Sequence, residues 1–81
     1  MSKKYIVYGK GSCPYCTMAV SLLEQRGEAY DFVDLQEKAT ILSEVKSYYD
    51  HDTVPIIITK DSEDRWSFVG GYTELESLFG G

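Results

Sequence analysis

The chain has 81 residues, a formal net charge of −5 and only two cysteines. This length predicts one domain over residues 1–81, and the 43% apolar content is too high for a disordered chain. The negative charge argues against nucleic acid or an anionic membrane as the main partner, because a polyanion would be repelled. The first residues lack the apolar segment of a signal peptide, and no apolar run approaches the ~18 residues of a membrane span. We therefore expect a cytoplasmic location.

The first half of the chain predicts a strand, a helix and a second strand. Residues 5–8 form a short β-prone run that Gly9 ends. Pro14 suits the first turn of a helix, where its missing N–H costs nothing, and Gly27 is a natural helix stop. Between them, four apolar residues recur at the spacing of one helical face: Cys16, Ala19, Val20 and Leu23. Residues 29–35 then indicate a second strand.

The second half predicts a helix, a hairpin and a closing helix. The spacing of Ala39, Leu42, Val45 and Tyr49 indicates a helix over residues 36–49. Residues 54–59 are apolar and β-branched, as in a strand buried on both faces, with the proline near its start. After a polar turn at residues 60–64, residues 65–69 predict a strand with Trp66 and Phe68 on one face. Thr73 can then cap a last helix, whose core-facing residues would be Leu75, Leu78 and Phe79.

The predicted order is β-α-β-α-β-β-α. A right-handed parallel β-α-β unit followed by a hairpin and a helix gives a four-stranded mixed sheet flanked by three helices. This order is the α/β architecture of the thioredoxin-like fold.

Cys13 and Cys16 form a C-x-x-C pair after the first strand, where a helix begins. In a cytosolic protein this context indicates thiol–disulfide chemistry. The unpaired N–H groups and positive dipole end of a helix favour a thiolate on Cys13, whereas Cys16 lies one turn deeper. We therefore assign Cys13 as the nucleophile and Cys16 as the resolving thiol. Three alternatives stay open: a zinc site that includes His51, an iron–sulfur cluster shared between two chains, and two inert buried cysteines.

Three motifs together resemble the glutaredoxin family over essentially the whole chain. They are Cys13-Pro14-Tyr15-Cys16, the family's dithiol signature, then Thr53-Val54-Pro55 opening a strand, and Gly70-Gly71 before the last helix. The resemblance implies that Lys10 steadies the thiolate and meets the glycine carboxylate of glutathione, and that Tyr15 flanks the substrate groove.

The resemblance also assigns the rest of the glutathione site. It implies a cis-proline turn at Val54-Pro55, preceded by Thr53, with the Val54 backbone pairing with the cysteinyl part of glutathione. Backbone N–H groups of the segment at Gly71, Tyr72 and Thr73 would hold the γ-glutamyl carboxylate, as a nest at a helix start does. Glu74 would meet the ammonium group of glutathione.

Two features depart from the family pattern. Glu74 stands where family members commonly have an aspartate, which adds a methylene. Asp50 and Asp52 flank His51 just before Thr53, and only Lys46 is basic nearby. Two acids beside the groove should weaken its attraction for a tripeptide with two carboxylates. We interpret His51 as a loop residue with no role as a general base.

The resemblance implies a glutathione-dependent thiol–disulfide oxidoreductase that reduces protein disulfides and glutathione mixed disulfides. It would act as a monomer with no metal and no tightly bound cofactor, using glutathione as co-substrate. One alternative is a donor recharged by thioredoxin reductase, with ribonucleotide reductase among its disulfide-containing partners. A second is a non-enzymatic dimer that binds an iron–sulfur cluster, against which the Pro14-Tyr15 linker counts.

Overall fold

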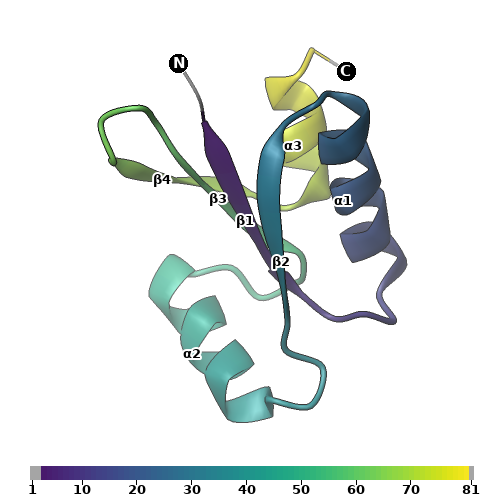
Figure 1. Cartoon of the computed structure of the whole chain (residues 1–81). Helices are drawn as coiled ribbons and strands as arrows, with labels where there is room; N and C mark the ends of the chain where they lie inside the picture. The colour runs from purple at the N-terminus through teal and green to yellow at the C-terminus, as the bar shows by residue number, and fades with distance from the viewer. Residues whose placement is uncertain (1–2, 81) are drawn as a thin grey trace.

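The computed structural model describes residues 3–80. It contains four strands and three helices among these residues: β1 Lys4–Gly9, α1 Pro14–Gln25, β2 Ala29–Asp34, α2 Ala39–Tyr49, β3 Ile56–Lys60, β4 Trp66–Gly70 and α3 Tyr72–Leu78. The sheet has the order β2-β1-β3-β4, with α1 and α3 on one side and α2 on the other (Figure 1). Strand β1 pairs with β2 in parallel and with β3 antiparallel, and β3 pairs antiparallel with β4. The predicted mixed sheet with three helices is confirmed.

The main core lies between the sheet and the α1–α3 side. The strands supply every second residue to this layer, as the pleat requires, and the helices supply one face each. Its buried members are Tyr5, Val7, Ala19, Leu23, Ile57 and Leu75. Because β1 and α1 both belong to this core, the loop between them, which carries Cys13, has two rigid anchors.

Two predicted element starts are wrong because local contacts bind the preceding residues. Helix α2 begins at Ala39 rather than at residue 36, since the Gln36 N–H donates to Asp34 Oδ1 at 3.0 Å and fixes a turn. Strand β4 begins at Trp66, since the Arg65 N–H donates to Asp61 Oδ1 at 3.1 Å. Strand β3 also begins two residues later than predicted, at Ile56, so it spans Ile56–Lys60 and follows the proline.

The closing helix also differs from prediction in two respects. Its N-cap is Gly71, so Thr73 lies inside the first turn and does not cap it. Leu75 is fully buried and Phe79 packs against the core, but Leu78 is 50% exposed. Leu78 shares the helical spacing of Leu75 but is the last residue of α3, where half of its side chain remains in solvent.

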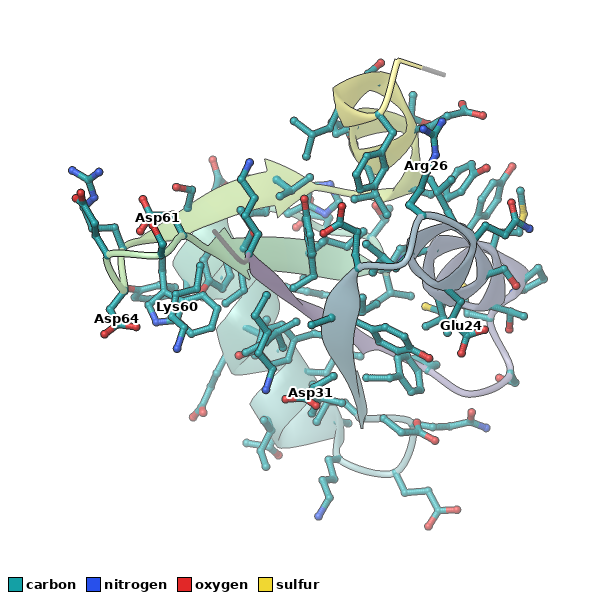
Figure 2. The ribbon with its side chains drawn as sticks, turned by 45° about the horizontal axis from the view of Figure 1, so that its top comes forward. Glu24, Arg26, Asp31, Lys60, Asp61 and Asp64 are labelled. Carbon is teal, nitrogen blue, oxygen red and sulfur yellow. The ribbon has the colours of Figure 1, made fainter. Side chains whose placement is uncertain are left out.

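Charged side chains lie on the periphery. Figure 2 shows Lys60, Asp61 and Asp64 at the turn between β3 and β4, where Lys60 Nζ is 3.3 Å from Asp64 Oδ1. Such exposed pairs contribute little to stability, so the apolar core is the main stabilising element. None of the helices within residues 3–80 has the length and apolarity to cross a membrane.

Candidate active site

Cys13 is the N-cap residue of α1. Its backbone is extended, with φ −85° and ψ 122°, and Pro14 occupies the first helical position. The Cys13 N–H donates to the carbonyl of Lys10 at 3.1 Å, and the Cys13 carbonyl accepts from the Thr17 N–H at 3.2 Å. The Cys13 side chain makes no capping hydrogen bond of the usual kind, so its sulfur is left beside the free N–H groups of the first helical turn.

This position lowers the pKa of the Cys13 thiol. Partial burial pushes the pKa upward, but the nearby Cys16 N–H, Cys16 thiol and Tyr15 N–H, which favour the charged sulfur, outweigh it, and the Lys10 charge adds to them. The net pKa lies below the ordinary value. Because hydrogen bonds to the charged form favour that form, the sulfur of Cys13 is suited to be a thiolate.

Cys16 has the opposite environment. It is 1% exposed, and its Sγ accepts a hydrogen bond from the Lys10 N–H at 3.4 Å. Burial is the main cause that raises its pKa to about 11; the Lys10 N–H opposes this rise, and Cys13 and Asp34 add to it. Both thiols are free. The pair therefore consists of a partly exposed thiol that ionises readily and a buried thiol that stays protonated.

A groove of about 390 Å³ borders this end of α1. Its walls come from three segments far apart in the sequence: Tyr15, His51, Thr53, Val54, Pro55, Gly71, Tyr72, Thr73 and Glu74. The Val54–Pro55 peptide bond is cis, as the resemblance implies. The rings of Tyr15 and Tyr72 lie 6.1 Å apart between centroids, which joins the α1 wall to the α3 wall. The fold thus brings together the predicted glutathione-contacting residues, with one exception.

The exception is Lys10. It lines a separate cavity of about 250 Å³ together with Leu35, Gln36, Ala39, Leu42, Ser43 and Lys46. Lys46 is therefore a second ammonium group in the Lys10 cavity. From the sequence Lys46 is only a basic residue in the neighbourhood, because a cavity between a loop and a helix leaves no local pattern.

His51 is the groove residue that the sequence analysis missed. It follows α2 in a loop, as predicted, but it lines the groove, and its Nδ1 lies 2.9 Å from the Thr53 carbonyl oxygen. Its position two residues before Thr53, a predicted groove residue, could have indicated that it lines the groove. Asp50 and Asp52 are exposed and do not line the groove. The acids expected beside the site therefore lie farther out than the histidine between them.

Glu74 bonds to its own helix. Its Oε1 accepts from the Gly71 N–H at 2.8 Å, which closes the first turn of α3. The hydrogen bond from Gly71 is the largest cause of the lowered pKa of the Glu74 carboxyl; its own N–H and the charge of His51 act in the same direction, and burial opposes them. The carboxylate thus occupies one of the N–H groups that the resemblance assigns to a ligand carboxylate.

The described residues hold no cluster of three or more His, Cys, Asp or Glu side chains that could bind a metal ion. With Cys13, Cys16 and His51 not gathered into one donor set, residues 3–80 give no support to a zinc site within the chain.

Comparisons with known proteins agree with this geometry. A family model described as Glutaredoxin matches residues 5–63. Among solved structures, a dithiolic glutaredoxin from Trypanosoma brucei brucei superimposes with a TM-score of 0.75 at 28% identity, covering 96% of this chain and 78% of the other. A glutaredoxin from Brucella melitensis gives a TM-score of 0.75 at 27% identity, with 95% and 78% covered.

A third neighbour is similar in fold only. It is a buckwheat glutaredoxin–glutathione complex, with a TM-score of 0.78 at 20% identity, covering 96% of this chain and 69% of the other. No curated protein sequence matches the chain significantly.

Proposed function

This chain belongs to the glutaredoxin family of thiol–disulfide oxidoreductases, and we propose that it reduces protein disulfides and mixed disulfides between proteins and glutathione. Cys13 is the nucleophile in this proposal and Cys16 is the resolving thiol. The observation that carries it is the contrast between the two thiols: Cys13 is partly exposed at the helix start with a lowered pKa, whereas Cys16 is buried and its pKa is raised to about 11.

In the first step the Cys13 thiolate attacks a disulfide of the substrate. One new S–S bond forms to Cys13, the substrate S–S bond breaks, and the leaving thiolate takes a proton from water. The gain from a low pKa is small in this step, because nucleophilicity falls as the thiolate fraction rises. It is larger when an external thiolate resolves the mixed disulfide, because Cys13 is then the leaving group and a low pKa makes its departure faster.

The second step can follow two routes. When Cys13 has taken the sulfur of glutathione from a glutathionylated substrate, a second glutathione thiolate attacks that sulfur, releases Cys13 as a thiolate and forms oxidised glutathione. Alternatively, Cys16 loses its proton and attacks Cys13, which forms the Cys13–Cys16 disulfide and releases the substrate thiol. Burial and the charge on Cys13 both disfavour the Cys16 thiolate. Cys16 can therefore ionise more easily once Cys13 is in the mixed disulfide and has lost its negative charge.

We place glutathione in the groove beside Tyr15. The backbone of Val54 would pair with its cysteinyl part, and N–H groups at the start of α3 would meet its γ-glutamyl carboxylate. The fact that one structural neighbour is a glutathione complex supports this ligand. Lys10 and Lys46 line the neighbouring cavity, where their ammonium groups would attract the glycine carboxylate.

Reduction of a glutathionylated peptide tests the proposal. Cys13→Ser should abolish turnover, whereas Cys16→Ser should retain it and lose the reduction of a protein disulfide that needs both thiols. Turnover that survives Cys13→Ser would refute the assignment of the nucleophile. The double variant gives the background rate.

A second candidate differs in the electron source. Glu74 already occupies the Gly71 N–H, so the groove offers one fewer free donor to a tripeptide with two carboxylates, and the exposed Asp50 and Asp52 add negative charge next to His51. These features favour a donor that thioredoxin reductase recharges and that serves disulfide enzymes such as ribonucleotide reductase. Incubation of the oxidised protein with each recycling system separately would distinguish the two, since only one should restore the free thiols.

A further inference from the structure

The loop that leads into the active-site helix is fastened to the loop that follows β2. The Gly11 N–H donates to Asp34 Oδ1 at 3.1 Å, and the Ser12 N–H donates to Gln36 Oε1 at 3.0 Å. These residues are separated by 23 and 24 positions in the chain. Two consecutive backbone donors just before Cys13 are thus bound by two side chains from another segment.

The two acceptors are themselves fixed. Asp34 Oδ1 also accepts from the Gln36 N–H at 3.0 Å, and the Leu35 N–H donates to the carbonyl of Gly9 at 2.8 Å. Asp34 Oδ1 therefore binds the loop before Cys13 and the loop after β2 at once. The hydrogen bond between Leu35 and Gly9 joins the same two segments through their backbones. This arrangement explains why the second segment turns at Gln36 instead of starting a helix there.

The fit at Gly11 is close. A Cβ atom at this position would lie 2.9 Å from Asp34 Oδ2, which is too near for any residue other than glycine without a shift of the carboxylate. Gly9 and Gly11 would give a free loop wide conformational freedom. The contacts to Asp34 and Gln36 remove that freedom at the two residues that precede the nucleophile.

We propose that Asp34 and Gln36 are positioning residues that hold Gly11 and Ser12 so that Cys13 stays at the N-cap of α1. The inference rests on the proposed role of Cys13. The thiolate is stabilised by N–H groups of Tyr15 and Cys16 only while its backbone keeps the N-cap geometry. A loop released from Asp34 lets Cys13 move away from these donors.

Asp34 has a second, separable effect, because its negative charge helps to raise the pKa of Cys16. Other charged side chains nearby are Lys10 on the held loop and Glu37 and Lys38 beside Asp34. An amide at position 34 keeps the acceptor oxygen and removes the charge, so it separates the positional effect from the electrostatic one.

The experiment measures the pH profile of Cys13 alkylation in the reduced protein, with each cysteine followed by mass spectrometry. Asp34→Ala and Gln36→Ala should both move the Cys13 midpoint upward, whereas Asp34→Asn should leave it near the wild-type value. Turnover of a glutathionylated peptide should fall about threefold in Asp34→Ala, the scale of a lost hydrogen bond.

Asp31→Asn is the matched control. Asp31 is an exposed aspartate of the same strand, and it pairs with Lys4 at 2.9 Å, away from the active-site loop. A wild-type Cys13 profile in a folded Asp34→Ala variant, or an equal shift in Asp31→Asn, would overturn the proposal. Alkylation needs no turnover, so the result stands apart from the choice of substrate. If Cys13→Ser retained activity, the proposed function would fail. The alkylation profiles of the Asp34 and Gln36 variants would still show whether these residues control the position of Cys13.

Discussion

The backbone N–H of Lys10 donates a hydrogen bond to Cys16 Sγ at 3.4 Å, so the loop that precedes Cys13 also contacts the buried thiol of Cys16. The hydrogen bond opposes the effect of burial, but the pKa of Cys16 is still raised to about 11. The same loop places Cys13 at the helix start, where its pKa is lowered. One short loop thus contributes to the difference in pKa between Cys13 and Cys16, which are three residues apart.

We expect the two thiols of the reduced protein to titrate separately. Cys13 should be alkylated with a midpoint below that of an ordinary thiol, and Cys16 should stay unmodified until the pH approaches about 11. The measurement is iodoacetamide labelling at a series of pH values, followed by peptide mapping. In urea the two midpoints should merge, because burial and the helix both disappear. Equal midpoints in the folded protein would contradict the assignment of roles.

Replacement of Lys10 by glutamine should raise the pKa of Cys13. The shift should be modest, because the Lys10 charge is the smallest of the causes that lower this pKa, after the N–H groups and the Cys16 thiol. Lys46→Gln is the matched control, since Lys46 lines the same cavity but does not act on the thiol. The same labelling series measures both variants. A larger upward shift in Lys46→Gln than in Lys10→Gln would show that the cavity, rather than the single ammonium, controls the thiol.

Glu74→Asp should improve the use of glutathione substrates. A shorter carboxylate keeps the charge but reaches the Gly71 N–H less well, which leaves this donor to a ligand carboxylate. The KM for a glutathionylated peptide should fall by about twofold to tenfold, the worth of one hydrogen bond. Glu74→Gln is the paired variant: it keeps the bond and removes the charge, so its KM should rise. A higher KM for Glu74→Asp than for the wild type would contradict this interpretation.

Leu75→Ala and Leu78→Ala should differ sharply in stability. Both remove the same atoms from the same helix, but Leu75 is fully buried and Leu78 is half exposed. The free energy of unfolding should fall by about 2–5 kcal/mol for Leu75→Ala, which leaves a cavity in the core. For Leu78→Ala the loss should be about 0.5 kcal/mol. Urea unfolding followed by circular dichroism measures both, and comparable losses would mean that Leu78 packs against the core after all.

Much of the active site is visible in the sequence because its signals are local. Pro14 at the first helical position and two cysteines one turn apart define a helix start with a thiol on it, and no distant residue is needed for this conclusion. The alternation of strands and helices predicts the mixed sheet in the same way. The segments before β3 and at the start of α3 also predict seven of the residues that line the groove, and Tyr15 of the first motif is the eighth.

Tertiary structure decided the features that depend on contacts between distant segments. His51 lines the groove because the loop after α2 lies beside Gly71, the N-cap of α3, and Lys10 lies in a different cavity with Lys46. The start of α2 moved to Ala39 because Gln36 bonds to Asp34 and to Ser12. The spacing of apolar residues predicts which face of a helix or strand is buried. It does not predict which polar side chain accepts a hydrogen bond from a backbone N–H of a distant segment. For this protein the sequence therefore determined the thiol pair and its helix, while packing decided what holds that pair in place.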